Sequence, residues 1–316
     1  MRIKAENNVV FLYPGQGAQQ VGMGFDLYQN YPVARQIFNQ ADQILGFPLS
    51  QLCFKGPEEE LHRDLNAQIA VYTVSCILTE VLRTNNIFPD MVSGYSSGFY
   101  AAAYAASCFD FSYGLYLVKR AGEILLQEGC KIKGGMVLVF GLSPEKVKYI
   151  CRQVGNVEVA ILNTSRQIII SGITSSLNEA MDLSLKEGAL DVYPLSVATA
   201  YHSKFMKQSA KHFFNEINEK FLKDPQIPVM SYLSLDWVLS KKDLKKIMAV
   251  QLSGPVLWVD LIKKISNNRN RLLFEVGPGD IIFRTVKWID RNIEMMTTDS
   301  IEGLNTAIEK LKTINT

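Results

Sequence analysis

The chain has 316 residues, of which 47% are hydrophobic and 20% are charged, and its formal net charge is +2. This balance is typical of a globular protein, and it excludes nucleic-acid binding through a strongly basic surface. The sequence lacks an uninterrupted apolar run of about 18 residues and a secretion signal at residues 1–8, so we expect a cytoplasmic protein with no membrane contact.

The cysteines are scattered, odd in number and without C-x-x-C spacing, which predicts reduced thiols and neither a disulfide framework nor a metal site. They are Cys53, Cys76, Cys108, Cys130 and Cys151.

The first third of the chain alternates short apolar runs with helical patterns. Residues 9–13 are predicted to form a buried strand that ends in a glycine turn, and a helix capped by Asn66 should follow. Residues 91–94 form the next predicted strand, and residues 113–126 the next long helix. This alternation predicts an α/β fold with a parallel sheet core, in a large domain of the α/β-hydrolase kind.

From residue 134 the order of elements changes. Two strand–helix–strand patterns follow one another and predict a β-α-β-β-α-β unit, which is ferredoxin-like. The predicted elements are strand 136–140, helix 143–153, strands 157–163 and 167–172, helix 175–187 and strand 190–197. We therefore expect a small domain, residues 132–198, inserted into a large domain formed by residues 1–131 and 199–316. An amphipathic helix at 203–222 and a buried strand at 272–276 should complete the large domain.

Residues 94–98 read G-Y-S-S-G, which is the G-x-S-x-G pattern of a nucleophile elbow. An apolar strand pattern precedes it and an alanine-rich helical pattern follows it, as this motif requires. The helix N-terminus favours negative charge that develops next to the serine. Ser96 is therefore the candidate nucleophile.

A serine hydroxyl needs a base, and the chain has three histidines. His62 and His212 lie in polar surroundings and are expected to be solvated. His202 follows a predicted strand end, where side chains face the cleft of an α/β fold. A histidine at a helix start can also be satisfied by backbone groups alone, but Ser96 with His202 is the best available pair.

Eight ordered segments resemble the malonyl-CoA:acyl-carrier-protein transacylase family, which includes the acyltransferases of polyketide synthases. Among them are F-L-Y-P-G-Q-G-A-Q at 11–19 and Y-H-S at 201–203. The full set comprises residues 11–19, 66–68, 94–98, 119–121, 163–172, 201–203, 251–258 and 275–279. The resemblance covers nearly the whole chain.

The resemblance implies an acyl-serine mechanism. Ser96 would attack the thioester, and His202 would act first as base and then as acid. Gln251 would hold His202 through its backbone carbonyl, in place of the aspartate of a triad. The N–H groups of Gln16 and Ser97 would form the oxyanion hole.

The resemblance also implies how the acyl group is bound. Arg120 would clamp the free carboxylate of a malonyl group, although a helix arginine can also lie on the surface. Gln68, Asn163, Tyr95 and Tyr201 would complete the substrate-binding residues.

The implied substrates are malonyl-CoA and the phosphopantetheine thiol of an acyl carrier protein or a carrier domain, with no permanently bound cofactor. Lysines near residue 241 would help to dock an acidic carrier protein, or would form a solvated face, which is the plainer interpretation. They are Lys241, Lys242, Lys245 and Lys246.

The chain departs from the family pattern around the elbow. Tyr95 stands where the family has histidine, and Phe99 where it has glutamate. Ser97 is small and polar where apolar residues or glutamine are common. The bulk of Tyr201 should favour an unbranched acyl group, by about 1–3 kcal/mol for a methyl-sized clash.

Three functions follow in order of preference. The first is malonyl transfer for fatty-acid or polyketide synthesis by a stand-alone enzyme that is expected to be a monomer. The second is hydrolysis of acyl groups from a carrier protein, which a cationic Arg120 clamp would disfavour. The third, a carrier-binding module without activity, conflicts with the joint presence of Ser96, His202 and Gln251.

Overall fold

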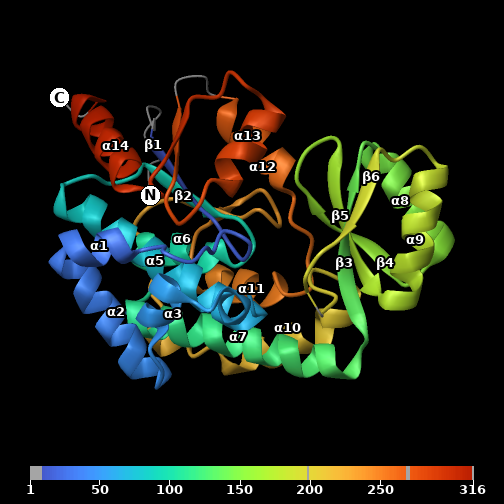
Figure 1. The fold of residues 1–316 in the computed structure, drawn as a ribbon, viewed down its shortest axis with the longest axis horizontal. Helices are drawn as coiled ribbons and strands as arrows, with labels where there is room; N and C mark the ends of the chain where they lie inside the picture. Colours follow the sequence, from blue (N-terminus) through green and yellow to red (C-terminus); the bar gives the residue numbers. More distant parts are fainter. Residues whose placement is uncertain (1–8, 198, 268–270, 315–316) are drawn as a thin grey trace.

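The computed structural model describes residues 9–197, 199–267 and 271–314. Its larger sheet, whose strands β1 and β2 are labelled in Figure 1, has six strands in the order β10-β9-β1-β2-β7-β8, with parallel pairing except between β7 and β8. The strands are β1 (Val9–Tyr13), β2 (Met91–Gly94), β7 (Val229–Met230), β8 (Trp237–Val238), β9 (Leu272–Glu275) and β10 (Met295–Thr297). Tyr13 pairs with Gly94, so the turns that leave β1 and β2 lie side by side.

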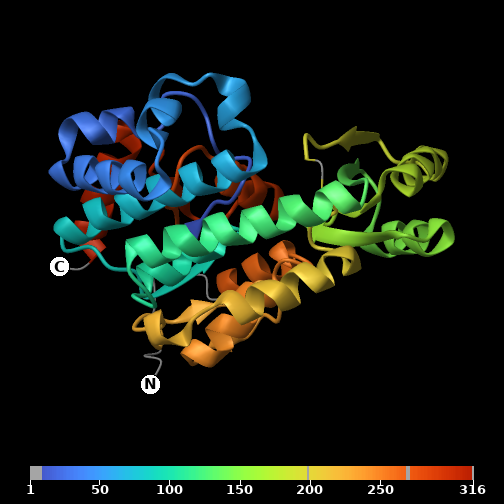
Figure 2. The ribbon, with the colours of Figure 1, turned by 90° about the horizontal axis from the view of Figure 1, so that it is seen from below.

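Helices pack around this sheet. They are α1 (Phe25–Asn30), α2 (Pro32–Leu45), α3 (Leu49–Lys55), α4 (Glu58–Leu61), α5 (Asp64–Thr84), α6 (Gly98–Ala105), α7 (Phe111–Lys131), α10 (Lys207–Glu216), α11 (Lys241–Val250), α12 (Trp258–Ser266), α13 (Ile281–Ile289) and α14 (Ile301–Ile314). Figure 2, which views the molecule from below, shows α7 and α10 running side by side along this underside.

Helix α5 has the length and apolar composition of a membrane-spanning helix. However, 83% of its most apolar window is buried inside the molecule, where it serves as the central helix of the core. Cys53, Cys76, Cys108 and Cys151 are buried free thiols.

The second sheet has four antiparallel strands in the order β4-β5-β3-β6. Its elements are β3 (Gly134–Phe140), α8 (Pro144–Val154), β4 (Val157–Leu162), β5 (Gln167–Ile173), α9 (Thr174–Lys186) and β6 (Asp191–Pro194). This is the predicted β-α-β-β-α-β order, with both helices at the outer side of the sheet in Figure 1. A parallel bridge between Ile161 and Val256 joins this unit to the segment before α12. The residue limits of the small domain stay a prediction.

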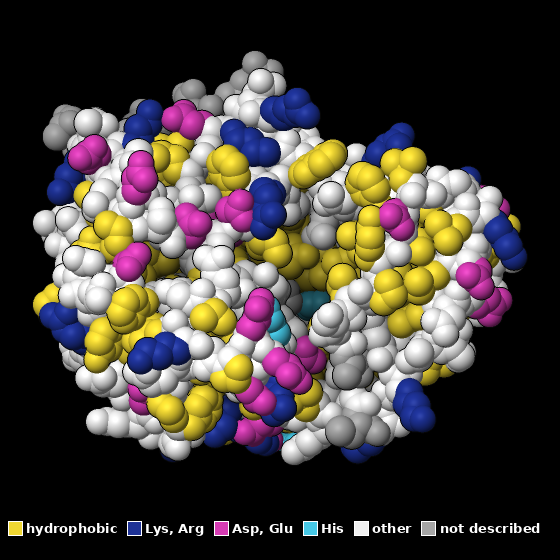
Figure 3. Space-filling view, in the orientation of Figure 1, with side chains coloured by type: hydrophobic (Ala, Val, Ile, Leu, Met, Phe, Trp, Pro, Cys, Tyr) yellow, Lys and Arg dark blue, Asp and Glu magenta, His cyan; other side chains and the backbone are white. Residues whose placement is uncertain are grey.

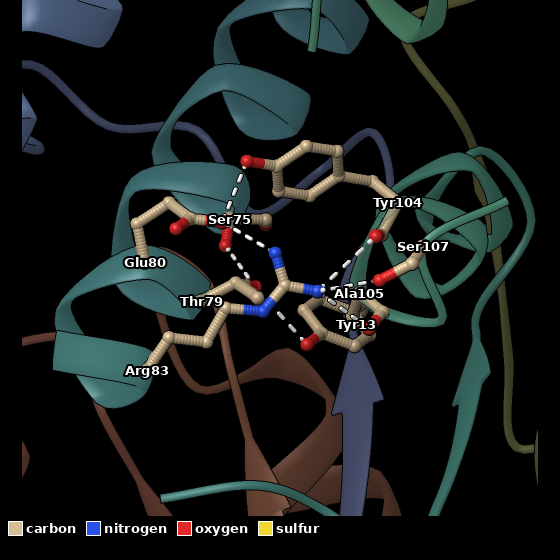
Figure 4. A network of polar contacts seen from close by, with 8 residues as sticks. All are labelled: Tyr13, Ser75, Thr79, Glu80, Arg83, Tyr104, Ala105 and Ser107. Carbon is tan, nitrogen blue, oxygen red and sulfur yellow. Dashed lines mark hydrogen bonds and ion pairs between the residues drawn. The ribbon is translucent and has the colours of Figure 1, made fainter. Parts of the chain in front are cut away.

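A polar network fixes α6, the helix that follows the elbow (Figure 4). Arg83, near the end of α5, donates to the Ala105 carbonyl at 2.7 Å and to Glu80 at 2.5 Å. Glu80 also accepts from the Tyr104 hydroxyl at 2.7 Å. Because Tyr104 and Ala105 end α6, these bonds anchor that helix to the central helix α5.

Two predicted elements differ from the structure. The helix expected at 203–222 is divided into the 3-10 helix Lys204–Met206, helix α10 and the 3-10 helix Glu219–Phe221. The main break is at Ile217, whose extended backbone (φ −69°, ψ 111°) ends α10 while its side chain stays buried. Helix α5 begins at Asp64, so Asn66 lies inside it and is not its N-cap.

Candidate active site

The elbow is a tight turn between β2 and α6. Ser96 has a φ of 52°, a left-handed conformation that is strained for a side chain other than glycine. A Cβ atom on Gly94 would lie 2.2 Å from the backbone of Gly98, and one on Gly98 would lie 2.1 Å from the Tyr13 carbonyl. The two glycines therefore let strand, turn and helix approach closely enough to present the Ser96 hydroxyl.

Ser96 and His202 form a hydrogen-bonded pair. The Ser96 Oγ atom lies 2.7 Å from His202 Nε2, and His202 Nδ1 lies 3.0 Å from the Gly254 carbonyl oxygen. A carbonyl accepts but cannot donate, so Nδ1 carries the proton and Nε2 is free to accept one from the serine. Burial lowers the pKa of His202 to about 4, so its imidazole is neutral at pH 7 and can act as a base.

Gln251 lies beside this pair but contributes less to holding the His202 ring than predicted. The carbonyl hydrogen-bonded to His202 Nδ1 at 3.0 Å belongs to Gly254, and both this carbonyl and that of Gln251 raise the pKa of the imidazole, Gly254 by more. The Gln251 side chain instead accepts from the Tyr232 hydroxyl at 2.8 Å. Gly254 is therefore the main orienting residue. Its role carries no side-chain signal in the sequence, because any residue supplies a carbonyl.

The predicted oxyanion donors meet at the N-terminus of α6, where backbone N–H groups lack helical partners. The Gln16 N–H group donates to the Ser97 hydroxyl at 3.2 Å. Gln16 follows β1 and Ser97 follows the nucleophile, so the adjacent turns of β1 and β2 bring them together. The N–H group of Gln16, one predicted oxyanion donor, is thus already hydrogen-bonded to the side chain of Ser97. The backbone N–H group of Ser97 is the other predicted donor.

A chain of hydrogen bonds forms one wall of the site. Gln68 donates to the Gln16 side chain at 3.0 Å, and Gln16 donates to Asp64 at 2.6 Å. Tyr201 donates to the other oxygen of Asp64 at 2.7 Å. Asp64 was missed at the level of sequence, because an acidic residue in the first turn of a helix is ordinarily explained by the helix dipole.

Tyr95 and Asn163 form a second polar contact. The Tyr95 hydroxyl donates to Asn163 at 2.7 Å, and the Tyr95 ring packs edge-on against Trp258 with centroids 5.1 Å apart. Burial raises the pKa of Tyr95, so its hydroxyl stays protonated at neutral pH. Through this contact, the residue after β2 holds the hairpin between β4 and β5.

These residues surround a cavity of about 530 Å³ between the two sheets. Figure 3 shows a hollow near the middle of the molecule with hydrophobic side chains in its depth. The apolar residues of the lining are Leu125, Met136, Ile161, Ile169, Leu195, Val197, Leu252 and Ile281. The polar ones are Gln16, Gln19, His62, Gln68, Tyr95, Ser96, Ser97, Asn163, Ser196, Tyr201, His202 and Gln251. His62, expected in solvent, has a side chain that is 42% exposed and reaches this lining.

Arg120 is not brought to the cavity. Its guanidinium makes a bidentate pair with Glu216 of α10, at 2.8 and 2.9 Å, and a further pair with Glu123. These carboxylates raise the pKa of Arg120, which keeps its charge. The prediction of a carboxylate clamp at Arg120 is therefore wrong for this geometry, since the residue faces α10 and not the cavity. Among the residues that the structure describes, the lining contains neither lysine nor arginine.

A half-buried serine that is hydrogen-bonded to a buried histidine beside a helix N-terminus defines a class of protein: the enzymes that work through an acyl-serine. Within the described ranges, no group of three or more His, Cys, Asp or Glu side chains is placed to hold a metal ion.

Comparison with known proteins narrows this class. The model of the acyl transferase domain matches residues 10–297. A malonyl CoA-acyl carrier protein transacylase of Bacillus subtilis is 34% identical and covers 98% of this chain and 99% of its own. The polyketide biosynthesis malonyl CoA-acyl carrier protein transacylase PksC of the same organism is 31% identical over 91% of this chain and 99% of its own.

A solved structure of a malonyl-transacylase in complex with its type II polyketide synthase acyl-carrier protein has a TM-score of 0.91 and 28% identity. It covers 96% of this chain and 99% of that one. The chain belongs to the acyl transferase domain family, and these matches confirm the predicted α/β fold class.

Proposed function

We propose that this chain transfers an acyl group, malonyl as in its relatives, from coenzyme A to the phosphopantetheine thiol of an acyl carrier protein. The observation that carries the proposal is the 2.7 Å contact between the Ser96 hydroxyl and a buried, neutral His202 at the wall of a cavity. Membership of the acyl transferase family supports the same reaction.

In the first half-reaction, Ser96 Oγ attacks the thioester carbonyl carbon while His202 Nε2 takes the hydroxyl proton. The resulting imidazolium is stabilised by the Gly254 carbonyl, which accepts from Nδ1 at 3.0 Å. The oxyanion is held by the N–H groups of Gln16 and Ser97, at about 3 kcal/mol per donor. Collapse of the intermediate breaks the carbon–sulfur bond, and the leaving thiolate recovers the proton from His202.

In the second half-reaction, the phosphopantetheine thiol enters the same cavity and gives its proton to His202. Its sulfur attacks the acyl-serine carbonyl, and Ser96 leaves with the proton. Every proton and bond is thereby accounted for by the two substrates and the Ser96–His202 pair, with no bound cofactor.

The partner we propose is an acyl carrier protein of fatty-acid or polyketide synthesis, in the cytoplasm. Free buried thiols are consistent with a reducing compartment. Docking through the lysines of α11 has weaker support, because Lys245 already pairs with Glu219 at 3.3 Å.

Hydrolysis of acyl carrier thioesters is the second candidate. The observation that favours it is the position of Arg120, whose expected clamp was the main argument against uncharged acyl chains. In this reaction water, deprotonated by His202, would discharge the acyl-serine in place of the carrier thiol.

One experiment tests the proposal. The protein is incubated with malonyl-CoA, acetyl-CoA or methylmalonyl-CoA, and its intact mass is recorded before and after addition of the carrier protein. We expect an acyl adduct that passes to the carrier and that Ser96→Ala abolishes, while the exposed Ser175→Ala on α9 retains it. Release of free acid without carrier acylation would favour the hydrolase, and loading of Ser96→Ala would refute the acyl-serine.

A further inference from the structure

We propose that the acyl pocket of this chain is built for uncharged acyl groups, which load onto Ser96 at least as readily as malonyl does. This inference rests on the proposed acyl-serine chemistry and concerns the substrate class of the same site. Three observations carry it: the direction of Arg120, the charges around the cavity and the apolar character of its walls.

The first observation concerns the faces of helix α7. Leu125 lines the cavity, and Ala121 lies one helical turn before it on the same face, with an exposed fraction of 1%. Gly122 faces α5 beside Leu65 and Gln68. Arg120 is rotated by about 100° from Ala121 and meets Glu123 and Glu216 on the side of α10.

The pairing leaves Arg120 without a free face for a substrate. Its Nε and one terminal nitrogen bind the two oxygens of Glu216, and the other terminal nitrogen binds Glu123. Such a bidentate, charge-assisted pair is among the stronger polar interactions in proteins. A substrate carboxylate would have to displace two carboxylates and reach the adjacent face of α7, which points toward α10.

The second observation concerns charge. The cavity lining offers amides, hydroxyls and two histidines. Among the described residues, those that line the cavity include no lysine or arginine. His202 is held neutral by burial, and His62 lies at 3.9 Å from Glu58. A buried carboxyl, that of Asp64, is hydrogen-bonded to Gln16 and Tyr201, and both of these line the cavity.

These charges disfavour a malonyl carboxylate. A carboxylate that leaves water needs an opposite charge or several donors, and here it would approach another carboxyl group instead. An uncharged acyl group escapes this penalty. It would instead contact the side chains of Leu125, Met136, Ile169 and Leu195, which suit an alkyl chain.

The test measures the release of coenzyme A thiol from butyryl-CoA and malonyl-CoA at matched concentrations, with intact mass as a second readout. Thiol release counts each loading event whatever becomes of the acyl-serine. We expect kcat/KM for butyryl-CoA to equal or exceed that for malonyl-CoA. A preference for malonyl of more than about twofold would overturn the inference while leaving the acyl-serine chemistry intact. Loading by neither donor would refute the proposed function and this inference with it.

Two variants locate the selectivity. Ala121→Arg places a guanidinium on the cavity face of α7, and it should raise the malonyl-to-butyryl ratio by about tenfold or more. The matched control, Arg120→Ala on the adjacent face, should leave that ratio within about twofold. Leu125→Arg provides a second cavity position if Ala121→Arg does not fold, as judged by its thermal melt. An unchanged ratio in a folded cavity variant, or loss of malonyl loading in Arg120→Ala, would overturn the inference.

Discussion

The hydroxyl of Ser97 is hydrogen-bonded to a backbone N–H group that the proposed reaction needs. In the structure it accepts the Gln16 N–H bond at 3.2 Å, although this N–H is one of the two proposed oxyanion donors. The developing oxyanion must therefore displace the Ser97 hydroxyl before it receives that bond. Removing the hydroxyl with Ser97→Ala should leave the donor free in the resting enzyme.

The magnitude follows from the strength of one neutral hydrogen bond. Such a bond contributes about 1 kcal/mol net, so freeing the Gln16 N–H should lower the acylation barrier by up to that amount. This corresponds to an increase of about fivefold in the rate of acylation. The backbone N–H of residue 97 remains in place, so the second donor is unaffected.

The assay is a single-turnover measurement of coenzyme A release, with the enzyme in excess over acyl-CoA. Ser97→Thr is the matched control, because it retains the hydroxyl and should keep the wild-type rate. A rate in Ser97→Ala that falls about tenfold or more would refute the reasoning, since it would mean that the hydroxyl itself donates to the oxyanion.

Three further predictions follow from the site. His202→Ala should slow loading by about a hundredfold or more in the same assay, and near-normal loading would contradict its role as base. Because burial lowers the pKa of His202 from 6.5 to about 4, the unfolded chain binds the extra proton between these pH values. The free energy of unfolding should therefore fall, by about 3 kcal/mol relative to His202→Gln, as the pH drops from 7 to 4. The free energies of unfolding of the two proteins are measured with denaturant at each pH. An equal change in both proteins between pH 7 and pH 4 would contradict the burial of His202. Arg120→Ala should lower the free energy of unfolding by about 1 kcal/mol, because its ion pair with Glu216 joins α7 to α10 but is partly exposed, and urea melts would measure the change.

The sequence predicted the chemical centre better than its surroundings. Ser96 was predictable because its glycines and the strand–turn–helix context report a backbone geometry that few other residues permit. His202 was predictable by elimination among three histidines. The strand end expected directly before it is not there, because β6 already ends at Pro194. The partner of His202 Nδ1 was not predictable, because the Gly254 carbonyl belongs to the backbone and leaves no trace in the sequence.

Arg120 shows the limit of motif matching on a helix. A shift of one residue rotates a side chain by about 100°, so a motif position that is uncertain by one residue leaves the direction of the side chain undetermined. Glu216, which decides where Arg120 points, lies 96 residues away in the chain. Similarly, the broken helix at Ile217 depends on tertiary packing, because its apolar spacing alone suits a continuous helix.

We propose that the chain works through an acyl-enzyme at Ser96. The most direct measurement is peptide mapping by mass spectrometry after brief incubation with acyl-CoA at low temperature. We expect the acyl mass on the peptide containing Ser96, and we expect it to disappear when carrier protein is added. An acyl group found on another residue, or carrier acylation that persists in Ser96→Ala, would rule out an acyl-enzyme at Ser96.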